Sequence, residues 1–166
     1  GPVGLFAVFE LGLLNLNCHV IDILDKPGGQ CAQLYPEKPI YDIPAYPVIT
    51  GQDLTENLLK QVKPFSPVLH YEQLASKIEK KDDGNWLVET DKGLIFDVKA
   101  VVIAAGGGSF EPKKPNIPDL DKYSKSISYS IDKVDRFKDK DIVILGGGDS
   151  ALDWTLQLCD TGKSLT

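Results

Sequence analysis

Hydrophobic and polar positions divide the chain into short apolar runs separated by turns rich in glycine and proline. Residues 3–14 are apolar almost throughout, with Glu10 as their single charge, which predicts a helix buried on most sides. Residues 18–24 are rich in β-forming side chains and predict the next strand. This order of helix and strand is typical of an α/β chain.

The middle of the chain predicts a helix followed by a small antiparallel meander. Thr50-Gly51-Gln52-Asp53 resembles a capping box, and the apolar stripe of residues 54–62 predicts the helix that it begins. Four short runs with β character then follow, and Asp83-Gly84-Asn85 supplies a hairpin turn between two of them. The predicted strands cover residues 68–71, 74–79, 86–90 and 94–98.

A continuous apolar run at residues 100–105 predicts a strand buried on both faces of a parallel sheet. Glycines 106–108 end it, and three prolines within residues 109–121 indicate a semi-rigid linker. The sequence therefore predicts a first domain at 1–108, a linker at 109–118 and a second domain at 119–166.

Residues 141–153, DIVILGGGDSALD, have the order strand, glycine turn and helix start. Gly146, Gly148 and Ala151 match the G-x-G-x-x-A spacing of a dinucleotide-binding turn. Gly146 permits the turn, Gly148 lets a pyrophosphate approach the backbone, and Ala151 lets the helix pack closely on the strand. The N–H groups at the helix start would then face the phosphates. The alternative is a purely structural glycine turn.

The beginning of the chain predicts a second turn of the same kind. Gly1 and Gly4 fit the second and third glycines of G-x-G-x-x-G, with the first glycine and its strand lost upstream, so we interpret the chain as a piece of a longer protein. Asp22 lies about 20 residues further on, where an acidic side chain accepts hydrogen bonds from a ribose. A surface aspartate after a core strand is the alternative.

The loop of residues 26–46 is long for a connector, which favours a binding role. Gly28-Gly29 would let the backbone approach a flat ligand, and Gln30 offers both a hydrogen-bond donor and an acceptor. Tyr35 offers a ring for stacking. For Tyr41 and Tyr46 we prefer a role in filling the core.

Composition and charge exclude several classes of function. The chain has 166 residues, 42% of them hydrophobic, and a net charge of −6, which argues against nucleic acid as a partner. It contains neither an apolar run of membrane-spanning length nor a signal-peptide pattern. Its three cysteines lack metal-binding spacing and predict free thiols in the cytoplasm. His19 and His70 are interpreted as packed or surface residues, so no metal site is expected.

Taken together, these motifs resemble the two-dinucleotide-binding flavoprotein reductases, and in particular the thioredoxin-reductase-like ferredoxin/flavodoxin–NADP⁺ reductases. The resemblance implies a Rossmann-like FAD-binding domain with an inserted antiparallel β-meander, followed by the start of a second Rossmann-like, NAD(P)-binding domain. It also implies a homodimer. The stretches that carry it are GPVG at 1–4, DKPGGQCAQLYPEKPIYDIPAYP at 25–47, VVIAAGGGSF at 101–110 and GGGDSALDW at 146–154.

The resemblance also implies roles for individual residues. Gly1 and Gly4 would border the FAD pyrophosphate and Asp22 would hold the adenosine ribose. Gln30 and Tyr35 would lie at the flavin, with Tyr35 stacked on the isoalloxazine ring. Ala75 would contact the adenine side through its backbone, Phe110 would lie beside the cofactor after the glycine-rich strand end, and Gly29 is also implied to bind the cofactor. Those implied at the NADPH pyrophosphate are Gly146, Gly148, Asp149 and Ser150.

One departure from the thioredoxin reductases bears on the reaction. Those enzymes carry a redox C-x-x-C before the second glycine motif, whereas residues 128–132 here read SYSID. A dithiol relay needs two thiols, so we expect electrons to leave the flavin directly. The resemblance then implies hydride transfer from NADPH and single-electron transfer to ferredoxin or flavodoxin, with no catalytic acid or base.

Two alternatives remain open at this stage. One is an NAD(P)H-dependent flavoprotein with another acceptor, because the residues that separate NADPH from NADH would follow Thr166. The other is a non-catalytic module that binds FAD or another nucleotide.

Overall fold

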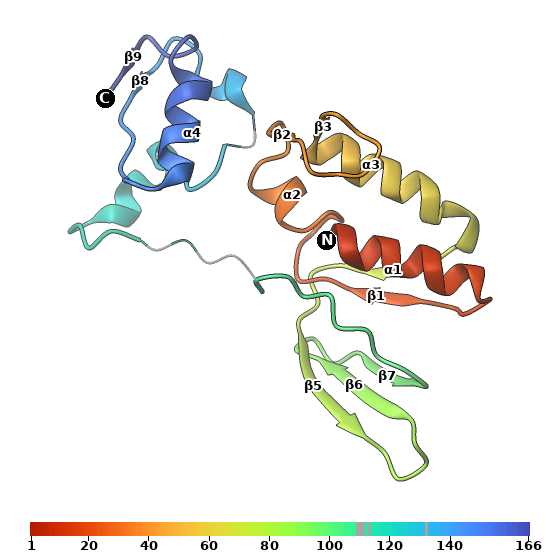
Figure 1. Cartoon of the computed structure of the whole chain (residues 1–166). Coiled ribbons are helices and arrows are strands. Elements are labelled where there is room, and N and C mark those ends of the chain that lie inside the picture. The colour runs from red at the N-terminus through yellow and green to blue at the C-terminus, as the bar shows by residue number, and fades with distance from the viewer. Residues whose placement is uncertain (109–111, 113, 132) are drawn as a thin grey trace. The chain divides into compact units, whose positions relative to one another are not determined.

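The computed structural model describes residues 1–108, 112, 114–131 and 133–166, which belong to two compact units, 1–112 and 113–166. Figure 1 shows the helices and strands of both units. The chain is mixed α/β, as predicted. The functional assignment of the predicted domains stays a prediction.

The first unit contains the predicted helix at the start of the chain, the predicted helix after the capping box and the meander. Most elements begin or end within a few residues of the predicted bounds. They are α1 (Pro2–Leu13), β1 (His19–Ile21), α2 (Gln30–Gln33), β2 (Pro39–Ile40), β3 (Ile49–Thr50), α3 (Gly51–Val62), the 3-10 helix η1 (Lys63–Phe65), β4 (Val68–His70), β5 (Ala75–Lys80), β6 (Trp86–Thr90) and β7 (Ile95–Val98).

The core of the first unit lies between two helices and a pair of parallel strands. β1 pairs with β4, with Val20 opposite Leu69, and α1 packs against α3. Figure 1 shows α1 lying between β1 and α3. Leu5 and Val8 of α1 and Val62 of α3 are buried together, and Val20 packs against them. Burial of this apolar surface is the main force that holds the unit together.

α1 is less buried than its apolar sequence predicts. Val3 is 72% exposed, Phe6 47% and Leu13 58%, so the prediction of a helix buried on most sides is wrong. The physical reason is that α3 and the strand pair cover only part of the surface of α1, and the elements that the structure describes leave Val3, Phe6 and Leu13 largely uncovered.

The predicted capping box begins α3. The Thr50 hydroxyl accepts a hydrogen bond from the backbone N–H of Asp53 at 3.0 Å, and it donates one to the Asp53 carboxylate at 2.7 Å. This satisfies an N–H group that has no partner within the helix and places an acidic side chain at the positive end of the helix dipole. The start of α3 is therefore fixed by local sequence.

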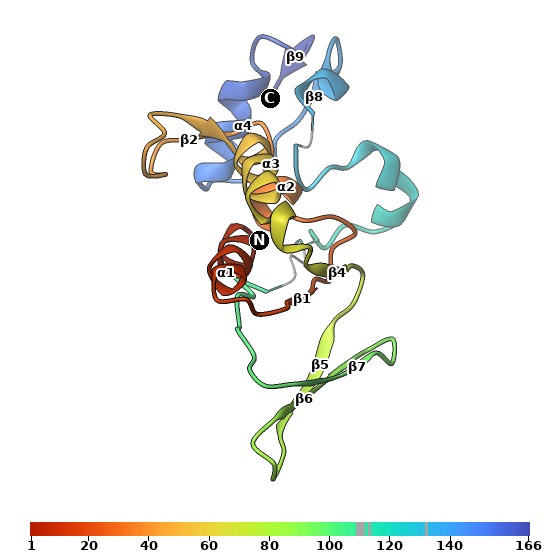
Figure 2. The same cartoon turned by 90° about the vertical axis from the view of Figure 1, so that its right-hand side faces the viewer.

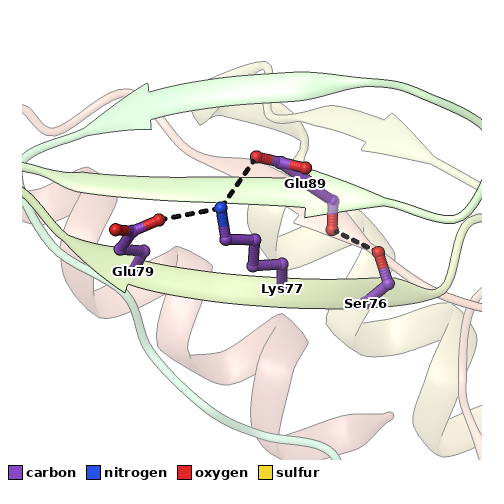
Figure 3. Close-up of polar contacts among 4 residues, drawn as sticks. All are labelled: Ser76, Lys77, Glu79 and Glu89. Carbon is purple, nitrogen blue, oxygen red and sulfur yellow. Dashed lines mark hydrogen bonds and ion pairs between the residues drawn. The ribbon is translucent and has the colours of Figure 1, made fainter.

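The meander is a three-stranded antiparallel sheet in the order β5-β6-β7, and the first of the four predicted strands belongs instead to the parallel pair, as β4. Gly84 turns the chain between β5 and β6 with a φ of +87°. Figure 2 shows the meander extending away from α1 and α3. Its surface carries ion pairs. The Lys77 ammonium lies 2.8 Å from a carboxylate oxygen of Glu79 and 3.4 Å from one of Glu89 (Figure 3). These groups are exposed and belong to the solvated face of the sheet.

A cluster of three rings joins the meander to the parallel strands. Nδ1 of His19 and Nε2 of His70 lie 2.9 Å apart, and the two imidazole rings are stacked. The ring of Phe96, from β7, lies 5.4 Å from His19 and 5.0 Å from His70, measured between ring centroids. The two histidines are packed against each other, as the interpretation of packed or surface residues allows.

Two predicted strands are not formed as expected. Residues 100–105 contain no strand, and Val102 and Ile103 are 58% and 78% exposed, so the predicted burial on both faces is wrong. In the second unit, the strand expected before the glycine turn of residues 141–153 is limited to Asp141–Ile142. A central strand needs a hydrogen-bonded neighbour on each side, and among the described residues 100–105 has none while Asp141–Ile142 has one.

The second unit contains a βαβ arrangement after two 3-10 helices. β8 and β9 pair in parallel, and α4 connects them. Leu158 of α4 and Ile131 are buried. The predicted order of strand, glycine turn and helix is thus confirmed. The elements are η2 (Leu120–Ser126), η3 (Val134–Phe137), β8 (Asp141–Ile142), α4 (Asp149–Leu158) and β9 (Ser164–Leu165).

Candidate functional site

The start of α1 presents backbone N–H groups that suit an anion. Gly1 is the N-cap residue, and no side chain in the described part of the chain caps the helix. Leu5 donates to the Gly1 carbonyl at 3.1 Å, and Pro2, at the first helical position, has no N–H group. The N–H groups of Val3 and Gly4 therefore have no partner within the helix, at the positive end of its dipole.

Asp22 is held at the end of β1 with its carboxylate directed toward the start of α1. Its backbone N–H donates to the His70 carbonyl at 2.9 Å, and its carbonyl accepts from Gln73 at 3.0 Å. Its Oδ1 accepts from the N–H of Leu24 at 3.1 Å, and its Oδ2 lies 3.7 Å from the nitrogen of Gly1. The backbone hydrogen bonds and the N–H of Leu24 orient the carboxylate, so it can serve as a hydrogen-bond acceptor at this position.

The two glycines of the long loop bring it against the start of α1. Gly28 and Gly29 have φ values of +111° and +59°, which favour glycine. A Cβ at Gly29 would lie 2.7 Å from Cα of Gly1, and a Cβ at Gly28 would lie 2.7 Å from the Thr55 side chain. Glycine is therefore needed here for space as well as for backbone conformation.

These segments enclose a small cavity. Its lining combines backbone at the helix start, one carboxylate, one phenol and several apolar side chains. The lining residues are Gly1, Gly4, Leu5, Val20, Asp22, Pro27, Gly28, Leu69 and Tyr71. Such a mixture suits a ligand with an anionic part and a polar, partly apolar ring system.

A third segment reaches the same region from later in the chain. A Cβ at Gly107 would lie 3.2 Å from Nε2 of Gln30, and a Cβ at Gly4 would lie 3.7 Å from Cβ of Ala104. The glycine-rich end of residues 104–108 therefore lies beside the start of α2 and the start of α1. The structure thus brings together Gly1, Gly4, Asp22, Gly29 and Gln30, which the sequence analysis names.

Other predicted residues are placed differently. Tyr35 follows α2 and is half-buried, with the Lys38 ammonium 6.0 Å from its ring centroid, and Ala75 begins β5 and is exposed. Neither lines the cavity. Phe110 lies outside the described residues. Tyr41 and Tyr46 are 71% and 43% exposed, so their expected role in filling the core is wrong, because the loop that carries them lies at the surface.

The second unit contains a separate glycine turn at the start of α4. A Cβ at Gly146 would lie 3.2 Å from Cβ of Ala151, so the strand end and the helix approach each other closely. Gly148 is the N-cap residue, and open space surrounds the position of a Cβ there. Asp149 and Ser150 occupy the first turn of α4 and are exposed. The turn can therefore present its backbone to an anionic group.

Tyr71 is a cavity residue that the sequence analysis missed. It directly follows β4, and it lies on the same side of that strand as Leu69, which also lines the cavity. Burial and the nearby charge of Asp22 raise the pKa of its phenol. The sequence did contain a signal for this residue. Tyr71 ends one predicted strand and Asp22 lies near the end of another, and the carboxyl ends of neighbouring parallel strands meet at one edge of a sheet.

Two further features bear on the kind of site. In the described part of the chain, no group of three or more His, Cys, Asp or Glu residues could hold a metal ion. The cysteines Cys18, Cys31 and Cys159 are free thiols. Among the helices that the structure describes, none has the length and apolar character needed to cross a membrane.

Comparison with known proteins places this architecture in a family. The model of the pyridine nucleotide-disulphide oxidoreductases matches residues 36–166. A ferredoxin–NADP reductase of Parvibaculum lavamentivorans is 60% identical over 159 residues, which cover 95% of this chain and 46% of that protein. A ferredoxin–NADP reductase of Bradyrhizobium sp. (strain BTAi1) is 58% identical over 167 residues, which cover 100% of this chain and 49% of that protein. The chain thus spans about half the length of these curated relatives.

Among solved structures, the thioredoxin reductase of Lactococcus lactis superposes with a TM-score of 0.78 at 24% sequence identity, covering 99% of this chain and 52% of that one. This likeness shows the fold. The fold and the two glycine turns define the class of proteins with two Rossmann-like units. Within that class, the chain belongs to the pyridine nucleotide-disulphide oxidoreductase family. The resemblance to ferredoxin–NADP reductases, inferred from four motifs, is confirmed by relatives of that name.

Proposed function

We propose that this chain forms the FAD-binding part and the beginning of the NADP(H)-binding part of a ferredoxin–NADP reductase. The observation that carries the proposal is the approach of Gly29 to Gly1, where a Cβ would lie 2.7 Å from the Gly1 Cα. This approach places the loop of residues 26–46 against the start of α1, which no side chain caps in the described residues, beside the carboxylate of Asp22. The names and the identity of the relatives support the same activity.

In this proposal the first unit binds FAD. The N–H groups at the start of α1 face the pyrophosphate, and Asp22 accepts hydrogen bonds from the adenosine ribose. Gln30, beside Gly107, lies toward the flavin end. Tyr35, Ala75 and Phe110 keep the roles that the resemblance implies. Tyr35 stacks on the flavin ring, Ala75 contacts the adenine side through its backbone, and Phe110 lies beside the cofactor.

The second unit binds NADP(H) at the start of α4. Open space around Gly148 fits the approach of a pyrophosphate to the backbone. Asp149 and Ser150 flank that approach from the first turn of the helix. No C-x-x-C precedes this turn in residues 128–132, which supports an acceptor other than a protein disulfide.

The chemistry belongs to the cofactor, which when bound takes up a hydride and gives up electrons singly. The chain's own residues bind and orient the two nucleotides, and no side chain is assigned a proton transfer. Ferredoxin or flavodoxin is the proposed acceptor. A cytoplasmic homodimer is proposed for the whole protein.

The test is the absorption spectrum of the full-length protein before and after NADPH. We expect flavin bands that bleach with NADPH and return when oxidised ferredoxin is added. Bleaching without re-oxidation by ferredoxin or flavodoxin would favour a flavoprotein with another acceptor. A folded, colourless protein that binds no FAD would overturn the proposal.

A further inference from the structure

Tyr71 lies in the wall of the proposed FAD cavity, to which the start of α1 contributes glycine backbone. Gly1, Gly4 and Gly28 contribute backbone to this cavity. Asp22 and Tyr71 contribute its polar side chains. Among the described residues that line this cavity, only the Tyr71 hydroxyl and the Asp22 carboxylate are side-chain groups that could form hydrogen bonds with a polar ligand.

The register of the strands explains why Tyr71 faces the cavity. Val20 pairs with Leu69, and both line the cavity. His70 points to the other face, where it meets His19 and Phe96. Side chains alternate along a strand, so the next residue, Tyr71, returns to the cavity side. The same edge carries Asp22, whose backbone N–H donates to the His70 carbonyl.

The chemistry of the two groups is complementary. A carboxylate can only accept hydrogen bonds, whereas a phenol can donate one. Burial and the negative charge of Asp22 raise the pKa of Tyr71, which keeps its proton in place. The Tyr71 hydroxyl forms no hydrogen bond with any residue in the part of the chain that the structure describes. A ribose presents hydroxyls that donate and accept, so it can satisfy both groups.

We propose that Tyr71 is a positioning residue for the adenosine half of the bound dinucleotide, in which its hydroxyl donates to a ribose oxygen while the Asp22 carboxylate accepts from a ribose hydroxyl. This rests on the proposed binding of FAD in the first unit. The half-buried ring of Tyr71 also forms an apolar wall of the site, next to Leu69.

The experiment compares two flavins on the full-length protein after its cofactor has been removed. FAD and FMN are titrated by flavin fluorescence into wild type, Tyr71→Phe and Tyr123→Phe, a matched control whose tyrosine is 62% exposed in the other unit. FMN lacks the adenosine half, so it reports contacts elsewhere in the site. Tyr71→Phe is expected to weaken FAD about 3- to 10-fold, the effect of one hydrogen bond, and to leave FMN affinity unchanged.

Two results would overturn the inference. Equal FAD affinity in wild type and Tyr71→Phe would remove the hydroxyl from the site. An equal loss of FAD and FMN affinity would show that the substitution disturbs the site as a whole. The contribution of the Tyr71 ring to stability is measured separately, by thermal unfolding of a second variant, Tyr71→Leu. Wild-type protein that binds neither flavin would overturn the proposed function as well, so the two failures are distinguishable.

Discussion

At the scale of single residues, two sets of glycines differ in the space that surrounds them. Gly28, Gly29 and Gly51 lie where a Cβ would meet backbone or a packed side chain at 2.6 to 2.7 Å. Gly147 and Gly148 lie in open space. Substitution in the first group forces neighbouring atoms of the protein to move. Substitution in the second group leaves the protein undisturbed and would obstruct only a bound ligand.

Gly29→Ala is expected to lower both stability and FAD affinity. The substitution places a Cβ 2.7 Å from the Gly1 Cα at a φ of +59°, so the loop must move off the helix start. The matched control is Gly93→Ala, which has a φ of +84° and nothing within 4 Å. Urea unfolding should show a loss of about 1 kcal/mol for the control and about 2–3 kcal/mol for Gly29→Ala. Equal losses would contradict the close contact.

Gly148→Ala is expected to weaken NADPH binding while the fold persists. Its φ of −98° is ordinary for alanine, and the added methyl meets no atom of the chain within 4 Å. The methyl would lie where a pyrophosphate approaches, so we expect a roughly tenfold rise in the Kd for NADPH. Stopped-flow reduction at varied NADPH measures this. FAD affinity serves as the internal control, and unchanged NADPH affinity would remove this turn from the site.

The three thiols should react at different rates. Burial raises the pKa of both Cys18 and Cys31, which lowers the fraction of reactive thiolate, while Cys159 is exposed. Titration with a chromogenic disulfide at pH 8 should therefore modify Cys159 first. Mass mapping of the first labelled peptide identifies the site, with Cys159→Ser as the control. First labelling at Cys31 would contradict the burial.

At the scale of elements, local signals predicted what local interactions form. The capping box of α3, the hairpin at Gly84 and the glycine turn before α4 each depend on neighbours in sequence, and each forms where expected. A strand at 100–105 would need hydrogen-bonded partner strands from distant parts of the chain. The local sequence does not reveal those partners, and no described strand pairs with these residues. The same limit explains why α1 was expected to be more buried than it is.

Phe96→Ala is expected to loosen the meander from the parallel strands. Its ring contacts both His19 and His70, and it is partly buried. Because the ring is partly exposed, we expect a loss of about 1–2 kcal/mol, below the roughly 3–5 kcal/mol of a fully buried phenylalanine. Ile95→Ala is the matched control, since Ile95 is the preceding residue of β7 and is 66% exposed. Equal urea midpoints for the two variants would contradict this role.

At the scale of the whole molecule, the sequence predicted which segments come together better than which side chains line the cavity. Spaced glycines and a carboxylate at a strand end are set by backbone geometry, so Gly1, Gly4, Asp22 and Gly29 could be placed from sequence. Tyr71 depends on the register between β1 and β4, which joins segments far apart in the chain. The roles of Ala75 and Phe110 came from family resemblance alone.

The pair of imidazoles on β1 and β4 links parts of the chain that lie far apart in the sequence. A hydrogen bond between two ring nitrogens 2.9 Å apart needs one ring to donate and the other to accept. His19 and His70 are separated by 51 residues, and Phe96, from β7, packs on both rings. The attachment of the meander to the parallel strands therefore depends on three side chains that meet only once the chain has folded.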